Sequence, residues 1–262
     1  MRILLIAYYF PPAGGAGVQR ALKFAKYWAK SGATVSVYCA EDAFYVKDQS
    51  LVDELPGTVE VVRLPHTTWL SRIIFWRNAL RGTSLARDGV APVSNGRYVR
   101  NFFGRAKEAF LRIRDFLIFP DDKISWVIHA GRLLSKKMAE GGHWDVVIST
   151  SPPFSSHLLG AWVKRKAGAI WIADFRDLWC GNPERKAHGI RHWLDLKLER
   201  YTLRRADHIV TVGKRMGEYF LHGHGLAEEV VHVINNGYDE ADFAGRQRRK
   251  LQTGLVDIVY IG

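Results

Sequence analysis

The feature that most constrains the fold of this chain is the alternation of short apolar runs with segments of helical periodicity. Residues 3–10 form an unbroken apolar run, and a helical pattern follows that ends at Gly32. Lys23, Lys26 and Lys30 fall on the outer side of this predicted helix. Because a continuous apolar strand is typical of a sheet covered on both faces, the pattern predicts an α/β fold with a mainly parallel sheet. Further strands are expected at residues 34–40, 59–64, 145–150, 169–175, 208–212 and 230–234.

Residues 66–142 interrupt this alternation and are too long for an ordinary connection, so we expect a helical insertion here. The segment carries 14 Lys or Arg against 6 Asp or Glu, which is eight of the twelve net positive charges of the chain. Its aromatic side chains, from Phe102 to Phe119, alternate with basic ones. Such a stretch suits an anionic membrane surface, but an insertion that packs its aromatic residues on the core explains it equally well. Nucleic-acid binding would rest on charge alone and is not expected.

The composition changes after residue 243. Residues 1–243 are expected to form one domain, residues 244–256 a linker, and residues 257–262 the first strand of a second domain that is missing. An alternative is that this last strand joins the existing sheet. We favour the first interpretation, in which the chain is the front portion of a longer protein.

The cysteine and hydropathy patterns exclude several classes of protein. Cys39 and Cys180 lie far apart in the sequence and form no metal-binding or redox spacing, which fits a reducing cytoplasm. No run of uncharged apolar residues is long enough to predict a transmembrane helix. The acidic residues and histidines show no spacing that completes a metal site, so no metal is expected.

A glycine-rich turn follows the first predicted strand. Gly14, Gly15 and Gly17 would let backbone amides approach a ligand, and the N-terminus of the next helix points its partial positive charge at the same place. This arrangement suits a phosphate or a sugar hydroxyl, although a tight turn alone would also need the glycines. The turn is not a dinucleotide fingerprint, because Arg20 stands where the third glycine should be.

Hydroxyl side chains follow the strand predicted at residues 145–150. Thr150 and Ser151 begin a loop that contains Pro152-Pro153, and His157 comes in the helix after it. Ligands of open α/β sheets bind outside the carboxyl ends of the strands, so this loop is a candidate site. A lone histidine beside leucines is also common as a packed or capping side chain.

A denser polar group, Asp174-Phe175-Arg176-Asp177, ends the strand predicted at residues 169–175. Arg176 can hold a phosphate or carboxylate with two hydrogen bonds, and Asp174 or Asp177 could bind sugar hydroxyls or act as a base. The alternative is an arginine–aspartate network that only braces the loop. We expect the loops of all these strands to meet at one rim of the sheet.

The last strand ends in Asn236-Gly237-Tyr238-Asp239. Asn-Gly predicts a turn that needs a positive φ angle, and this requirement alone would explain the motif.

In this order, the segments resemble the amino-terminal half of a family 4 glycosyltransferase of GT-B fold. More narrowly, they are similar to bacterial enzymes that build capsular, exopolysaccharide or lipopolysaccharide chains of the cell envelope. The matching residues are 8–12, Gly14, Gly15, Gln19, Arg20, 149–156, 174–179, 234–239, 242–243 and 258–262.

The resemblance implies a Rossmann-like parallel sheet with helices on both faces, which is the acceptor-binding front half of the GT-B fold. It also implies retaining transfer of a sugar from a nucleotide-sugar donor to a lipid-linked or polysaccharide acceptor, without a metal or other cofactor. Such an enzyme would be cytoplasmic and peripheral, bound at the inner face of the plasma membrane. The implied donor- or acceptor-binding residues are Gly14, Gly15, Gly17, Arg20, Thr150, Ser151, Arg176, Asn236, Gly237 and Asp239, and the catalytic candidates are Asp174, Asp177 and His157.

Two features depart from the family pattern. Many relatives carry a histidine directly after the strand at residues 145–150, where this chain has Thr150 or Ser151, so a catalytic role for His157 is doubtful. The rear domain with its glutamate pair is absent, and we therefore expect the chain alone to be inactive. The alternative function is a non-catalytic acceptor-binding module that works with a separate donor-binding chain.

Overall fold

The central strand of the sheet is apolar on both of its faces. In the computed structural model, which describes residues 1–41, 47–65, 119–182 and 189–244, this strand is β1 (Arg2–Ile6). Its successive side chains alternate between two hydrophobic cores, and none of Ile3, Leu4, Leu5 and Ile6 is more than 2% exposed. Both faces are covered, which explains the unbroken apolar run. The strand ends earlier than predicted, because residues 7–10 continue as a buried loop.

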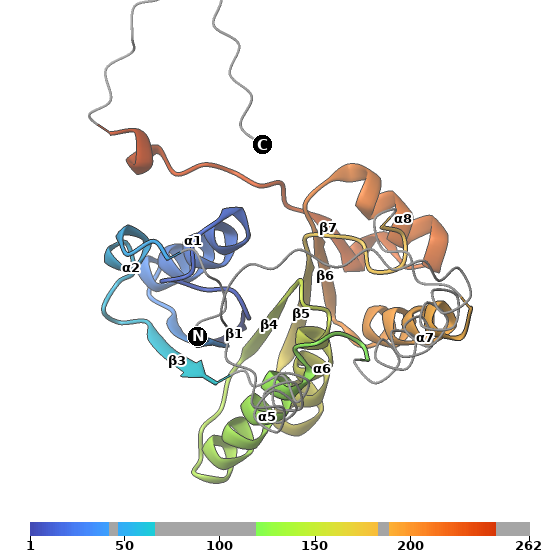
Figure 1. Ribbon diagram of the computed structural model, residues 1–262, viewed down its shortest axis with the longest axis horizontal. Helices are drawn as coiled ribbons and strands as arrows, with labels where there is room; N and C mark the ends of the chain where they lie inside the picture. Colours follow the sequence, from blue (N-terminus) through green and yellow to red (C-terminus); the bar gives the residue numbers. More distant parts are fainter. Residues whose placement is uncertain (42–46, 66–118, 183–188, 245–262) are drawn as a thin grey trace, which may run out of the picture.

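Seven parallel strands form one sheet in the order β3-β2-β1-β4-β5-β6-β7 (Figure 1). Besides β1, they are β2 (Thr34–Ala40), β3 (Glu60–Leu64), β4 (Val146–Ser151), β5 (Ile170–Phe175), β6 (His208–Thr211) and β7 (Val231–Val233). The strand order reverses between β1 and β4, which pair directly with Ile6 opposite Ser149. The predicted Rossmann-like α/β fold is confirmed, and its topological switch point lies at the carboxyl ends of β1 and β4.

Helices cover both faces of the sheet, as predicted. They are α1 (Ala16–Lys30), α2 (Ser50–Asp53), α5 (Ile124–Ala139), α6 (Ser155–Ala167), α7 (Gly189–Arg205) and α8 (Lys214–His224), with short 3-10 turns η1 (Glu228–Val230) and η2 (Glu240–Phe243). One core packs α1 against the sheet, and the other packs α5, α6, α7 and α8 against its opposite face (Figure 1). Helix α1 is followed by Gly32 at a φ of +86°, as its stop signal predicted.

The predicted insertion is in part an integral layer of the domain. Helix α5 falls within it and packs Trp126 and Leu134, both fully buried, against the sheet. Residues 66–118, which include most of the aromatic residues singled out above, lie outside the described residues. Residues 245–262, where the linker and the last strand are expected, also lie outside them. No described helix has the length and apolar character needed to cross a bilayer.

Helix α6 approaches the sheet so closely that Gly160 has no room for a side chain. Trp171 Nε1 donates a hydrogen bond of 2.9 Å to Ser149 Oγ beneath this helix. A Cβ atom at Gly160 would overlap both the Trp171 indole and Ser149 Oγ. The glycine therefore sets the distance between α6 and the strands that carry the rim.

We predict that Gly160→Ala lowers the free energy of unfolding by about 1–3 kcal/mol, because the added methyl group overpacks this contact. Gly131→Ala in α5 is the matched control, since its Cβ would meet Leu159 Cδ1 at an ordinary 3.6 Å. The control should gain up to about 1 kcal/mol from helix propensity. Urea unfolding measures both variants, and equal stability of the two would contradict the packing account.

Candidate functional site

A buried ion pair joins the first helix to the carboxyl end of β5. Arg20 Nη2 lies 2.9 Å from Asp174 Oδ1, and Arg20 Nε donates to the same carboxylate oxygen at 3.2 Å. The two side chains are only 7% and 3% exposed. Thr150 Oγ1, near the end of β4, donates to Asp174 Oδ2 at 2.8 Å. The pair therefore connects α1, β4 and β5.

The same arginine also holds the segment that follows β7. Arg20 Nη1 donates to the carbonyl oxygen of Ile234 at 3.0 Å and to Asn236 Oδ1 at 3.2 Å. Four segments that are far apart in the sequence thus meet at one rim, where the loops of a parallel sheet open. Arg20, expected as a ligand-binding residue, is here the residue that ties these segments together.

Arg176 reaches from the end of β5 to the start of α1. Its Nε donates to the Ser151 carbonyl oxygen at 3.0 Å, and its Nη1 donates to the Gly17 carbonyl oxygen. Burial lowers the pKa of the guanidinium, while the carboxylates of Asp174 and Asp177 raise it, and an arginine so placed stays protonated at neutral pH. No hydrogen bond to a described residue occupies its Nη2 atom. Asp177 is exposed beside it.

The glycine turn gives α1 an uncapped N-terminus next to Arg176. Gly15 has a φ of +98° and a ψ of 165°, a conformation open essentially to glycine alone, and no side chain caps the helix. The first turn contains no acidic residue, and an ideal Cβ on Gly17 would lie 3.4 Å from Arg176 Nη1. Gly14 is buried behind this turn. Backbone N–H groups of a helix N-terminus beside a guanidinium form an environment that favours an anion.

His157 lies in the core and not at the rim. The side chain is fully buried, its ring lies 4.3 Å from that of Phe175, and its Nδ1 is 2.8 Å from Ser149 Oγ. Burial lowers the pKa of the imidazole to about 3, so the ring is neutral at physiological pH. A catalytic role for His157 stays a prediction, and the position is the one expected of a packed histidine. Ser151 is also fully buried, and its Oγ lacks a partner among the described residues.

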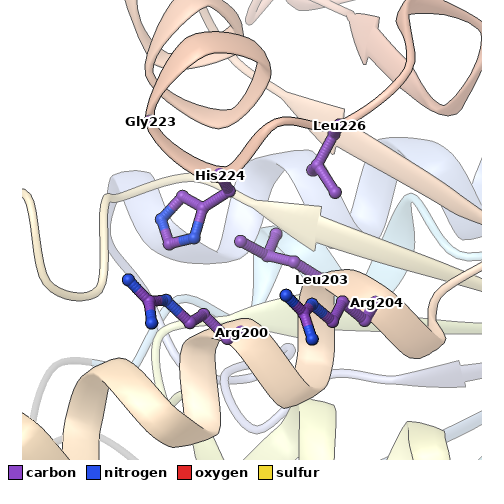
Figure 2. Close-up of a pocket in the computed structure, with 6 residues that line it drawn as sticks. All are labelled: Arg200, Leu203, Arg204, Gly223, His224 and Leu226. Carbon is purple, nitrogen blue, oxygen red and sulfur yellow. The ribbon is translucent and has the colours of Figure 1, made fainter.

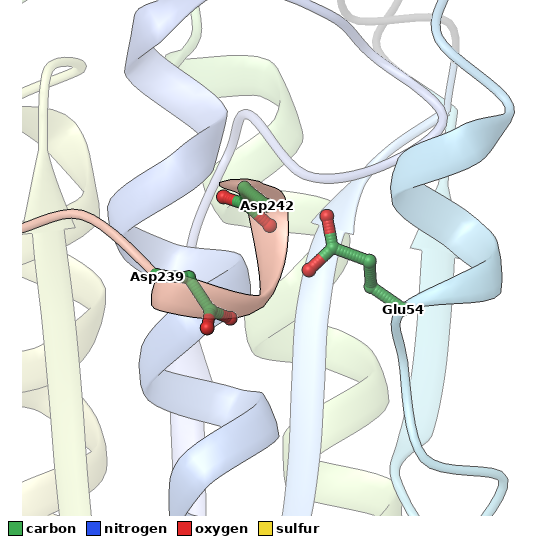
Figure 3. Close-up of side chains that lie close together, drawn as sticks. All are labelled: Glu54, Asp239 and Asp242. Atoms are coloured by element: carbon green, nitrogen blue, oxygen red, sulfur yellow. The ribbon is translucent and has the colours of Figure 1, made fainter. Parts of the chain in front are cut away.

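A cluster of opposite charges anchors the end of the domain on α1. Figure 3 shows the carboxylates of Glu54, Asp239 and Asp242 gathered around one point. Lys26 Nζ lies 2.7 Å from Asp239 and 2.8 Å from Glu54, and Lys23 Nζ lies 2.8 Å from Asp242. The hydrogen bond from Lys26, and after it the one from Tyr27, holds the pKa of the Asp239 carboxyl well below its usual range. Two ammonium groups supply the positive charge at this cluster, so it does not suit a metal ion.

Sequence reasoning did not find this cluster. Lys23 and Lys26 were expected on the outer side of α1, but Lys26 is only 7% exposed because the segment after β7 crosses over the helix (Figure 1). The predicted positive-φ turn at Gly237 is wrong, since this glycine does not adopt that conformation. Arg20 and the lysines hold the crossing segment at both ends, at Ile234 and at Asp239, and draw it across α1. In the sequence, the only sign of this ion cluster is the spacing that places Lys23 and Lys26 on one face of the helix.

The crossing segment and α1 enclose an open cleft of about 530 Å³ beside the rim. It is lined by Gln19, Arg20, Lys23, Phe24, Tyr27, Asn235, Asn236, Gly237, Tyr238, Asp239, Asp242 and Phe243. The predicted binding residues Asn236, Gly237 and Asp239 therefore border this cleft, with Asp239 committed to the ion cluster at its edge.

Comparison with known families gives one match that spans most of the chain. Residues 14–237 match the model of a family described as "Glycosyl transferase 4-like domain". This match includes the glycine turn, the ends of β4 and β5, and the first part of the crossing segment. No curated protein matches the sequence.

Several solved structures are similar to this chain at low sequence identity. A crystal structure of Anabaena Alr3699/HepE in complex with UDP has a TM-score of 0.47 and 13% identity, over 91% of this chain and 45% of that one. Phytolacca americana UGT2 complexed with UDP-2fluoro-glucose and pterostilbene has a TM-score of 0.45 and 12% identity, over 98% and 54%. A glycosyltransferase from Rickettsia africae ESF-5 has a TM-score of 0.45 and 15% identity, over 93% and 45%. The chain thus spans about half the length of these proteins.

The buried His157 should make stability depend on pH. Its folded pKa of about 3 lies below the unfolded value of 6.5, so its contribution is complete above pH 6.5 and is lost as the pH falls toward 3. At pH 5 we expect a loss of about 2 kcal/mol from this group relative to pH 7. Denaturant unfolding between pH 5 and pH 7 measures the slope.

His157→Gln should flatten this pH dependence, although it lowers the overall stability. His222→Gln, which replaces an exposed histidine of α8, is the control for the loss of one histidine. A parent protein with no slope, or equal slopes in the parent and His157→Gln, would contradict the assignment.

Proposed function

The chain belongs to the family of glycosyl transferase 4-like domains, and we propose that it forms the acceptor-binding half of a glycosyltransferase. In this proposal the complete enzyme transfers a sugar from a nucleotide-sugar donor to a lipid-linked or polysaccharide acceptor of the bacterial cell envelope, with retention of configuration. A second domain supplies most of the donor site, and this chain alone does not turn over. The observation that carries the proposal is the convergence of four segments on Arg20 at the carboxyl edge of the sheet.

The anion-binding features of the rim fit the chemistry of this reaction. Breaking the bond between a sugar and a diphosphate develops negative charge on the leaving group, and oriented donors stabilise that charge. The N-terminus of α1 and the Nη2 atom of Arg176 offer such donors side by side. We therefore propose that this turn, with Gly14, Gly15 and Gly17, contacts a phosphate of the donor or of the acceptor.

The two aspartates at the end of β5 have different tasks in this proposal. Asp174 already accepts hydrogen bonds from Arg20 and Thr150 on both carboxylate oxygens, so it acts as a positioning residue. Asp177 is exposed and carries the carboxylate available to a sugar hydroxyl. Asp177 is therefore our candidate for contact with the acceptor.

The proposed enzyme uses no metal ion. Lys23 and Lys26 occupy the acidic cluster formed by Glu54, Asp239 and Asp242 with two ammonium groups, and this cluster is the one group of potential metal ligands in the part of the chain that the structure describes. The leaving diphosphate is stabilised by amides and guanidinium groups instead. We place the enzyme in the cytoplasm, at the inner face of the plasma membrane, where a lipid-linked acceptor would lie and where the net charge of +12 favours anionic lipid.

Transfer by the natural full-length protein tests the proposal. Incubation with membranes of the source organism and a panel of radiolabelled nucleotide sugars should move label from one donor into the lipid or polysaccharide fraction. Arg176→Ala should lower the rate about 100-fold, because it removes a donor aimed at the developing charge. Arg165→Ala, at an exposed position of α6, should leave the rate unchanged, and thermal unfolding should show that both variants fold.

Equal rates for Arg176→Ala and Arg165→Ala would contradict the role of the rim. Acceptor binding without transfer from any donor would instead favour a non-catalytic binding module. The anomeric configuration of the product, read by NMR, tests retention.

A further inference from the structure

A basic pocket, apart from the cleft beside the rim, lies between the C-terminal ends of α7 and α8 (Figure 2). Its volume is about 250 Å³, and it is lined by Arg200, Leu203, Arg204, Gly223, His224 and Leu226. Figure 2 shows the imidazole of His224 above the guanidinium groups of Arg200 and Arg204, which rise from successive turns of α7. Because α7 and α8 run back from the carboxyl ends of β5 and β6, these helix ends lie at the edge of the sheet opposite the rim.

The histidine of this pocket, His224, is held in place by a buried carboxylate. His224 Nε2 lies 3.2 Å from the Glu199 carboxylate, and the two side chains are 5% and 0% exposed. The Cys180 amide and the Tyr219 hydroxyl donate to the same carboxylate at 3.1 and 3.3 Å. The Glu199 carboxylate thus has three contacts inside the protein. The second ring nitrogen of His224, Nδ1, is buried without a hydrogen-bond partner among the described residues.

The two arginines bring positive charge that the protein leaves uncompensated. Arg200 and Arg204 are exposed, and neither forms a hydrogen bond or ion pair with a described residue. The acidic residues of α7, Asp195 and Glu199, are both buried, and the Glu199 carboxylate faces His224. Two guanidinium groups in an i, i+4 pair lie beside an imidazole nitrogen without a partner among the described residues, and no acidic side chain is among the described residues that line the pocket.

We propose that this pocket binds a phosphate group, with Arg200 and Arg204 as its charged donors and His224 Nδ1–H as the third. Guanidinium groups match the geometry of phosphate oxygens, and charge-assisted hydrogen bonds of this kind are strong. Because the Glu199 carboxylate lies at Nε2 of the ring, Nδ1 is the nitrogen left for a ligand in the pocket. The site is separate from the proposed transfer site and does not depend on it.

The phosphate group can belong to a phospholipid headgroup or to a soluble molecule, and the exposed face of α7 makes both sources worth testing. Ile190, Trp193 and Tyr201 are 72%, 57% and 38% exposed, and lie on the same side of the helix as Arg200 and Arg204. Lys197 lies over the Trp193 ring at 5.3 Å from its centroid. Exposed aromatic side chains among cations are typical of a surface that contacts lipid, so a phospholipid headgroup is tested beside a soluble phosphate.

Titration of the 262-residue chain with inorganic phosphate tests the pocket itself. The imidazole signals of His224 in a proton–nitrogen NMR spectrum, assigned with His224→Gln, should shift and saturate. Chloride at equal ionic strength should leave them in place. The double variant Arg200→Gln/Arg204→Gln should weaken binding at least about tenfold, since it removes two charged donors. Arg165→Gln/Lys166→Gln removes the same charge from the last turn of α6 and should bind as the parent does.

Sedimentation with vesicles tests the lipid headgroup as the source of phosphate. Vesicles of phosphatidylglycerol and phosphatidylcholine are compared with vesicles of phosphatidylcholine alone. Weaker sedimentation with anionic vesicles for the Arg200/Arg204 double variant than for the Arg165/Lys166 control would support a lipid-borne phosphate. A response of His224 to inorganic phosphate without this difference would support a soluble one. If His224 responds to neither probe, or if the two double variants behave alike in both assays, the proposal is overturned. Sugar transfer enters neither assay, so these outcomes leave the function of the rim untouched.

Discussion

The rim of this domain depends on the burial of one arginine–aspartate pair. Taking Arg20 and Asp174 out of water costs several kcal/mol for each ion, and their mutual attraction offsets this cost only with good geometry and further hydrogen bonds. The structure provides these bonds through Thr150 and through the chain that follows β7. Because Arg20 is part of α1, the same pair fixes where the helix N-terminus meets Arg176. The anion binding that we propose at the rim would therefore depend on a contact that need not touch the ligand.

A second set of charges fixes the outer side of α1. Lys23 and Lys26 hold Asp239 and Asp242 on the helix, so the chain that leaves β7 passes the rim before it reaches the ion cluster. This path forms one wall of the cleft beside Arg20. The cations of α1 thus have two different tasks. Arg20 joins the ends of the strands, and Lys23 and Lys26 hold the segment that crosses over the helix.

The sequence predicts the sheet well because burial of a strand leaves a local signature. Unbroken apolar runs such as residues 3–10 identify the strands, and polar residues after them identify the loops at the carboxyl edge. The pairing of these residues has no such signature: Arg20 meets Asp174 from 154 positions away and Lys26 meets Asp239 from 213 positions away. Arg20 was therefore expected to bind a ligand, and Lys26 to face solvent. His157 shows the same limit, since only packing reveals that its ring is enclosed.

The most direct test of this account is a double-mutant cycle between Arg20→Gln and Asp174→Asn, followed by urea unfolding. Each single variant leaves a buried charge without its partner and should lower the free energy of unfolding by about 3–5 kcal/mol. The double variant should be more stable than the sum of the two losses predicts, with a coupling energy of about 2 kcal/mol or more. Additive losses, with no coupling between the two positions, would contradict the claim that this pair holds the rim together.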